Sequence, residues 1–135
     1  MALIVTVDDH DDVRALIERS LQRAGHTVIT AVDGVTGLAA VRQYRPNVVI
    51  TDVDMPRMNG LELCDAITHD PDLQHIPVML VSGSIHPSDP RSDYAGAAAM
   101  LSKPFAPKRL LDAVDALLAR GTDTSRVDTA LGAKR

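Results

Sequence analysis

The stretch VVITDVDMP, residues 48–56, joins an apolar, β-branched run to an aspartate and then to a proline. Such a run predicts a buried strand that carries the carboxylate of Asp52 at its C-terminal end. In an open parallel sheet, ligands bind in the crevice at those ends of the strands. The stretch therefore predicts that Asp52 is the acting residue and that the rest of the chain positions it.

The bulk composition indicates one domain without a membrane segment. The chain has 135 residues, 45% of them hydrophobic, which is enough for a core, and its net charge of -4 argues against a nucleic-acid surface. No apolar run approaches the roughly 20 residues that span a bilayer, and the N-terminus has no basic start typical of a signal peptide. The single Cys64 excludes an intramolecular disulfide, and the histidines show no metal-ligand spacing. We therefore expect a cytoplasmic protein with no direct contact to nucleic acid.

Strand-like and helix-like patterns alternate five times along the chain. Short apolar runs predict strands at residues 3–7, 27–31, 48–51, 77–81 and 99–101. Apolar residues at helical spacing predict helices from residue 11 until a stop at Gly25, from about residue 35 to a point before Pro46, from the Asn59 cap through Ile67, and from Pro107 to about Arg120. Between the last two strands, Pro87 and Pro90 leave room only for a short helix that begins near Asp89. This alternation predicts an α/β fold in which helices cover both faces of a parallel sheet.

Capping residues and the loss of periodicity predict where helices and the domain end. Asp11 or Asp12 is expected to cap the first helix, and Asn59 the third. Past the last helix the sequence becomes polar and aperiodic. We therefore expect one domain over residues 1–120 and a tail over residues 121–135 that is disordered or a truncated linker.

Polar side chains follow the predicted strands at the edge where their C-terminal ends meet. They belong to Asp8, Asp9, Asp52, Ser82 and Lys103. Three neighbouring carboxylates repel one another unless a cation compensates, and Mg²⁺ takes carboxylates, water and phosphate as ligands. A lysine suits phosphoryl oxygens, and an aspartate beside the ion can attack phosphorus to give an aspartyl phosphate. The constellation predicts a site that accepts a phosphoryl group on Asp52.

Four motifs together resemble the receiver domains of two-component response regulators, in particular the single-domain chemotaxis type. They are Asp8-Asp9, Asp52-x-x-Met55-Pro56-x-Met58-x-Gly60, Ser82-Gly83 and Lys103-Pro104-Phe105. The match runs from Leu3 to about Leu118. The resemblance implies a flavodoxin-like, doubly wound (βα)5 sandwich whose five-stranded parallel sheet has the order 2-1-3-4-5.

The resemblance also implies a role for each site residue. Asp52 would take the phosphoryl group from a sensor histidine kinase or a phosphotransfer protein. The ligands of Mg²⁺ would be Asp8 (through water), Asp9, Asp52 and the backbone carbonyl of Asp54. Ser82 and Lys103 would contact the phosphoryl oxygens, and the Lys103–Pro104 bond would be cis. The chain would catalyse only its own phosphorylation and dephosphorylation, and would signal through a conformational change.

A downstream protein is expected to bind the face formed by residues 84–119. Receiver domains often carry an aromatic residue three positions before the lysine, and here that position is Met100, which is flexible and has no hydroxyl. The prolines within residues 85–90 fall on the same face. We expect this face to be locally mobile in the resting protein and to be reshaped on phosphorylation.

Two other functions fit parts of the sequence. Asp52-Val53-Asp54 also resembles the Asp-x-Asp of haloacid-dehalogenase-type phosphatases, in which the first aspartate is the nucleophile and the second a general acid. Its place on the third strand, the lack of chain for a substrate cap and the Asp8-Asp9 pair count against this alternative. The other is a phosphorylation-independent adaptor with receiver shape. The intact acidic pocket counts against it, whereas Met100 and the prolines of residues 85–90 favour it.

Overall fold

Five parallel strands form one sheet in the order β2-β1-β3-β4-β5. The computed structural model describes residues 2–83 and 96–130, and for residues 121–130 it describes the helical backbone alone. The strands are β1 (Leu3–Val7), β2 (Thr27–Ala31), β3 (Val48–Asp52), β4 (Val78–Ser82) and β5 (Ala99–Ser102). The predicted flavodoxin-like sheet and its strand order are confirmed.

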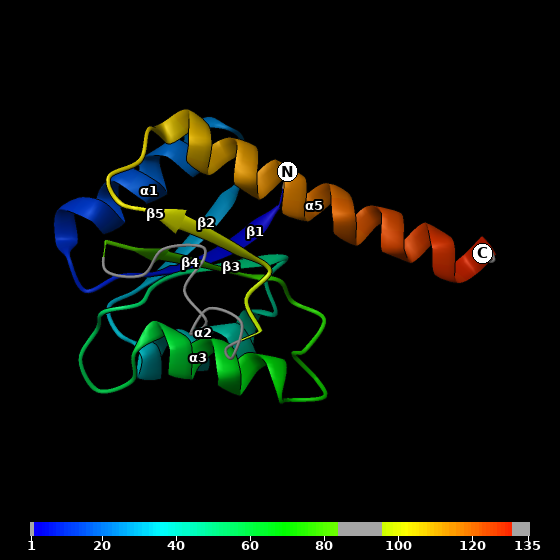
Figure 1. Ribbon diagram of the computed structural model, residues 1–135, viewed down its shortest axis with the longest axis horizontal. Coiled ribbons are helices and arrows are strands. Elements are labelled where there is room, and N and C mark those ends of the chain that lie inside the picture. Colours follow the sequence, from blue (N-terminus) through cyan, green and yellow to red (C-terminus); the bar gives the residue numbers. More distant parts are fainter. Residues whose placement is uncertain (1, 84–95, 131–135) are drawn as a thin grey trace.

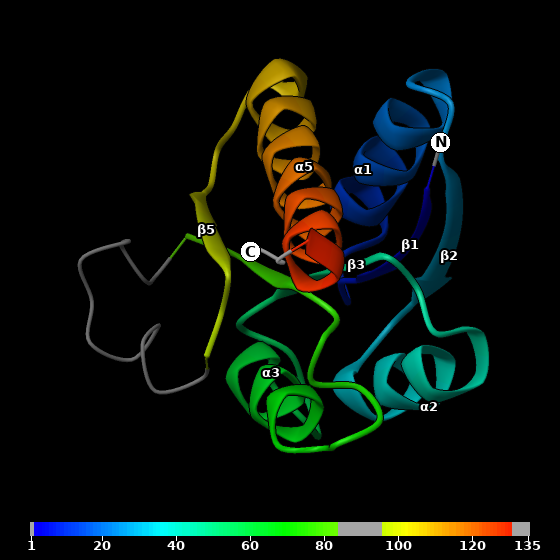
Figure 2. The same cartoon turned by 90° about the vertical axis from the view of Figure 1, so that its right-hand side faces the viewer.

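Helices cover both faces of this sheet (Figures 1 and 2). The described helices are α1 (Asp11–Arg23), α2 (Gly34–Tyr44), α3 (Gly60–Thr68) and α5 (Pro107–Ala130). Figure 2 shows α1 and α5 together on one face and α2 and α3 on the other. The short helix predicted near Asp89 lies outside the described residues. No helix in the described part of the chain combines the length and the apolar character that crossing a membrane requires.

The pleat of the strands divides the core into two layers. Ile4 of β1 belongs to the buried cluster that includes Ile17 of α1 and Leu110 of α5. Its neighbour Val5 belongs to the opposite cluster, with Leu63 of α3. Successive side chains point to opposite faces of a strand, so both faces of the sheet are packed and the central strands are apolar along most of their length. A buried polar residue at the end of such a strand therefore needs its own stabilising partners.

The strands that carry Asp52 and Ser82 extend one residue further than predicted. Both residues are the last in their strands, β3 and β4, instead of the first residues after them. The ladder continues because the Val53 N–H donates to the carbonyl of Val81 at 3.1 Å. Both side chains are consequently buried, with 3% and 1% of their surfaces exposed.

The start of α1 also differs from the prediction. Its N-cap is His10, and not Asp11 or Asp12. Asp11 already lies in the first helical turn, where its carboxylate pairs with the Arg14 guanidinium at 2.5 Å. The acidic residues therefore complement the N-terminal end of the helix dipole without capping it.

The last helix is longer than the sequence pattern predicts. α5 continues to Ala130, so the part of the expected irregular tail up to that residue is helical (Figure 1). Elongating an existing helix adds one hydrogen bond per residue without a new nucleation cost, and α5 is anchored by the buried Leu110 and Val114. The division into a domain over residues 1–120 and a tail stays a prediction.

The cap of α3 gives a first testable expectation. Asn59 is the predicted N-cap, and the prediction is confirmed: its side chain accepts from the Glu62 N–H at 2.8 Å, and its own N–H donates to the Glu62 side chain at 3.0 Å. We expect Asn59→Ala to lower the free energy of unfolding by about 1 kcal/mol, measured by urea denaturation. Asn59→Ser keeps a capping oxygen and should stay near the parent protein. Equal stabilities of the Asn59→Ala and Asn59→Ser variants would show that the capping oxygen contributes nothing to stability.

Candidate functional site

The C-terminal ends of three strands bring the predicted carboxylates and amine together. Asp8 follows β1, Asp52 ends β3, and Lys103 follows β5. The last of these is fixed by the sheet, because the ladder aligns Ser82 with Ser102 and the Lys103 N–H donates to the carbonyl of Ser82 at 2.9 Å. The Lys103–Pro104 peptide bond is cis, as predicted. The convergence of residues distant in sequence thus follows from parallel pairing alone.

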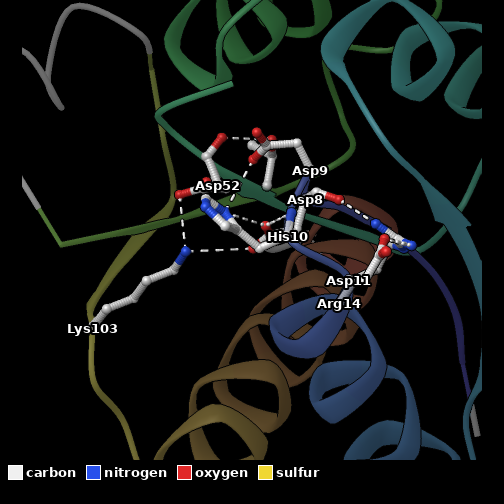
Figure 3. Close-up of polar contacts among 8 residues, drawn as sticks. Asp8, Asp9, His10, Asp11, Arg14, Asp52 and Lys103 are labelled. Atoms are coloured by element: carbon white, nitrogen blue, oxygen red, sulfur yellow. Dashed lines mark hydrogen bonds and ion pairs between the residues drawn. The ribbon is translucent and has the colours of Figure 1, made fainter. Parts of the chain in front are cut away.

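Lys103 bridges two buried carboxylates (Figure 3). Its Nζ lies 3.2 Å from Oδ1 of Asp52 and 3.4 Å from Oδ2 of Asp8. The side chains of Asp8 and Asp52 are 1% and 3% exposed, whereas that of Lys103 is 21% exposed. One ammonium therefore faces two desolvated carboxylates, and the third carboxylate of Asp9 lies beside them. Together these groups carry excess negative charge, which attracts a cation.

This charge imbalance acts on Asp52 directly. Burial raises the pKa of the Asp52 carboxyl, and the carboxylates of Asp8 and Asp54 raise it further. Lys103 opposes this by charge and by a hydrogen bond, which both favour the ionised form. Ionisation of Asp52 therefore destabilises the folded protein, and any further positive charge near the carboxylate would reduce this destabilisation.

The backbone around Asp8 holds its side chain in place. The His10 N–H donates to Oδ1 of Asp8 at 2.8 Å, and an Arg14 Nη donates to the Asp8 backbone carbonyl at 2.9 Å. Arg14 looked like one of several surface charges on a helix, and no local pattern marks its contact with a strand end. The buried carboxylate of Asp8 is consequently held in a defined position, whereas Asp9 beside it is partly exposed to solvent.

His10 lies at the site, although the sequence, which shows no metal-ligand spacing among the histidines, assigns it to the surface or a loop. Its Nδ1 lies 3.2 Å from Oδ1 of Asp9 and 3.4 Å from Oδ1 of Asp8. One ligand atom from each of Asp8, Asp9, His10 and Asp52 lies within 4.8 Å of all the others. The adjacency of His10 to an acidic pair was the available signal, but a loop histidine next to acids is usually a surface residue.

Ser82 and Asp54 are the remaining predicted site residues, and they differ in burial. Ser82 is buried at the end of β4 and contacts Lys103 through its backbone. Asp54 is exposed in the loop after β3, and its charge contributes to the raised pKa of Asp52. The proposed contact of the Ser82 hydroxyl with a phosphoryl group and the metal contact of the Asp54 carbonyl stay predictions.

The loop after β3 is packed tightly against the site. The Gly60 N–H donates to the carbonyl of Val53 at 2.9 Å. A Cβ atom added at Gly60 would overlap the backbone carbonyl of Asp52. The glycine in the sequence block after Asp52 is therefore required for space, directly behind the carboxylate.

The same loop is tied to the start of α2. Arg57, with a left-handed φ of 67°, forms an ion pair with Asp33, which is 4% exposed and accepts from the Thr36 N–H at 2.8 Å. These hydrogen bonds, first that from Thr36 and then that from Arg57, hold the pKa of Asp33 below its usual value against the effect of burial. A Cβ on Gly34 would meet the Met58 backbone, so the two loops pack backbone to backbone.

Comparison with known proteins gives one consistent family. The family model of the response regulator receiver domain matches residues 4–115. Protein PilH of Pseudomonas aeruginosa is 34% identical over 120 residues, which cover 88% of this chain and 99% of PilH. Response regulator MprA of Mycobacterium leprae is 40% identical over 117 residues, but the chain spans only 51% of its length. The structure of the chemotaxis response regulator CheY4 of Vibrio cholerae is similar with a TM-score of 0.82 and 34% identity, covering 87% of this chain and 99% of CheY4.

Proposed function

Since this chain belongs to the family of response regulator receiver domains, we propose that it accepts a phosphoryl group on Asp52 from a sensor histidine kinase or a phosphotransfer protein in the cytoplasm. One observation carries the proposal. The buried Asp52 carboxylate lies 3.2 Å from the Lys103 ammonium and beside Asp8 and Asp9. A nucleophile, a fixed positive charge and extra carboxylates are the groups that phosphoryl transfer to an aspartate requires.

The chemical step is a displacement at phosphorus. An Asp52 oxygen forms a bond to phosphorus as the phosphorus–nitrogen bond of a phosphohistidine breaks, and the released imidazole nitrogen keeps the electron pair and takes up a proton. Lys103 balances charge on the phosphoryl oxygens, and Ser82 donates a hydrogen bond to one of them. Asp52 supplies the nucleophile, and the residues around it contribute by positioning the reacting groups and balancing their charge.

The donor set fits the divalent ion that the family implies. Receiver domains typically bind Mg²⁺ at acidic residues, and this cluster offers oxygens from Asp8, Asp9 and Asp52 within 4.8 Å. The backbone carbonyl of Asp54 would complete the protein ligands. When bound, the ion supplies positive charge that offsets the carboxylates and the phosphoryl oxygens.

Labelling with a small phosphodonor tests the proposal. We expect ³²P-acetyl phosphate to transfer about one phosphoryl group per chain in the presence of Mg²⁺ and none above background in EDTA. The product should be an acyl phosphate, which alkali and hydroxylamine cleave. Alkali-stable labelling, or labelling that is independent of Mg²⁺, would contradict the assignment.

The two alternative functions predict different outcomes when phosphate-ester turnover is measured beside the labelling. A haloacid-dehalogenase-type phosphatase using Asp52 and Asp54 would turn over p-nitrophenyl phosphate many times, and the family match does not favour this reading. An adaptor that works without phosphorylation would take up no label. Stoichiometric labelling without sustained ester turnover supports the receiver against both.

The exposed acid at Asp54 gives a second expectation. Its carboxylate raises the pKa of Asp52, so Asp54→Asn should lower that pKa and reduce the repulsion of anionic donors. We expect the labelling rate with acetyl phosphate to rise severalfold at low salt and the lifetime of the phosphoryl group to change. Pulse labelling and chase at two salt concentrations measure both. Unchanged rates and lifetime would rule out an electrostatic role for Asp54.

We further propose that a downstream protein reads the site through the face of residues 84–119. Residues 84–95 lie outside the described part of the chain. Within the rest, the backbone contact between Ser82 and Lys103 joins the site to β5 directly. Met100 of β5 is partly buried against the core layer beneath α2 and α3, where its apolar side chain fills space.

A further inference from the structure

The imidazole of His10 lies among the carboxylates of the site with no structural task of its own. His10 is the N-cap of α1, but its side chain makes no capping hydrogen bond; the residue contributes through its backbone N–H, which binds Asp8. Its ring nitrogen Nδ1 instead faces Asp9 at 3.2 Å and Asp8 at 3.4 Å. The side chain is 65% exposed, so solvent reaches the ring, while Nδ1 points to the carboxylates of Asp8, which is buried, and Asp9, which is partly exposed (Figure 3).

The four donor atoms have the spread of a metal coordination sphere. An octahedral ion with bonds of about 2.1 Å holds adjacent ligands about 3.0 Å apart and opposite ligands about 4.2 Å apart. A ring nitrogen of His10 and carboxylate oxygens of Asp8, Asp9 and Asp52 all lie within 4.8 Å of one another, and Nδ1 is the nitrogen that faces Asp8 and Asp9. A contraction of less than about 1 Å would bring all four into contact with one ion.

The chemical type of the donor atoms determines which metal ion binds with the highest affinity. Mg²⁺ prefers oxygen ligands and gains little from an imidazole, whereas Co²⁺, Ni²⁺ and Zn²⁺ bind imidazole nitrogen well. We propose that His10 Nδ1 is a metal ligand and makes this a mixed nitrogen and oxygen site, selective for divalent transition ions. The proposal rests on the metal site of the proposed function and adds one ligand to it.

Paired calorimetric titrations of untagged protein with NiCl₂ and with MgCl₂ test this ligand. We expect His10→Ala to weaken Ni²⁺ binding about tenfold or more and to change Mg²⁺ binding by less than about threefold. His69→Ala is the matched control, because His69, the C-cap residue of α3, also pairs with one carboxylate, that of Asp65 at 3.1 Å, but belongs to no cluster of ligands in the described residues. It should leave both affinities unchanged.

A structural readout separates ligation from a charge effect. In the Co²⁺-loaded protein, hyperfine-shifted imidazole proton signals should be present in the NMR spectrum and should disappear in His10→Ala. Absence of such signals, or equal losses of Ni²⁺ and Mg²⁺ affinity, would overturn the proposal. If Mg²⁺-dependent labelling succeeds while the metal selectivity does not change, only this ligand assignment fails; if labelling fails while His10-dependent Ni²⁺ binding remains, only the phosphoacceptor function fails.

Discussion

Asp52→Asn is expected to abolish phosphoryl labelling while making the metal-free protein more stable. The amide nitrogen and oxygen have no carboxylate charge with which to attack phosphorus, so labelling by acetyl phosphate with Mg²⁺ should fall from about one group per chain to background. The side chain is nearly isosteric, and the Thr51 hydroxyl still donates to the backbone carbonyl of residue 52. Loss of labelling would therefore report lost chemistry and not a lost fold.

The gain in stability follows from the direction of the pKa shift. Since the pKa of Asp52 is raised in the folded protein above its ordinary value of 3.8, folding favours the protonated carboxyl. Its stabilising contribution is complete below the unfolded pKa and is lost as pH rises through the folded pKa, so ionised Asp52 costs stability at neutral pH. Asparagine has no charge to desolvate beside Asp8, and the variant should gain most at neutral pH.

Urea denaturation in EDTA, followed by far-UV circular dichroism, measures this difference. We expect the stability advantage of Asp52→Asn to be small at pH 3 and to grow toward pH 7. Asp112→Asn is a suitable control, because Asp112 is 63% exposed on α5 and pairs with Lys108 at the surface. A change within about 0.5 kcal/mol is expected there. An Asp52→Asn protein that is less stable than the parent at pH 7 would show that Lys103 outweighs burial and the neighbouring charges.

The sequence predicted the fold well because both faces of the sheet impose a repeating pattern. Short apolar runs such as residues 48–51 alternate with helical spacing, and this is sufficient for a parallel α/β sheet. The strand order 2-1-3-4-5 came from the family resemblance, since periodicity does not say which strands are neighbours. The predicted ends of β3 and β4 were one residue too early. Asp52 and Ser82 still pair in the backbone ladder, but their polar side chains interrupt the apolar pattern from which the strands were predicted.

The site residues that were missed owe their places to contacts between distant segments. Asp33 and Arg57 are 24 residues apart, and each looks locally like an ordinary turn or surface charge. Their ion pair exists because the loops after β2 and β3 pack together at the sheet edge. His10 was assigned to the surface for a different reason: its ring joins a cluster of possible ligands only because β3 places Asp52 beside the acidic pair.

Gly60→Ala is the substitution with the largest expected effect on stability. Gly60 is the first residue of α3, and helix propensity alone would make alanine better by nearly 1 kcal/mol. Space decides otherwise, because the new Cβ would overlap the carbonyl of Asp52 and lie 2.8 Å from the Cα of Val53. Both obstacles are backbone atoms at the end of a buried strand, so they yield only if β3 or α3 moves.

Moving either element disturbs the packing of α3 on the sheet, and we expect the free energy of unfolding to fall by about 3 kcal/mol. Gly83→Ala is the matched control: a Cβ there meets the Cβ of Lys103 at 3.8 Å, an ordinary contact, so the change should stay within about 0.5 kcal/mol. Urea titrations followed by circular dichroism compare the two, since the chain has no tryptophan for fluorescence. If the backbone at Asp52 and Val53 moves instead of α3, the Asp52 carboxylate is displaced as well, and the labelling rate per folded molecule should fall. A Gly60→Ala protein with the stability and the labelling rate of the parent would show that neither the packing of α3 nor the position of Asp52 depends on the close approach of Gly60.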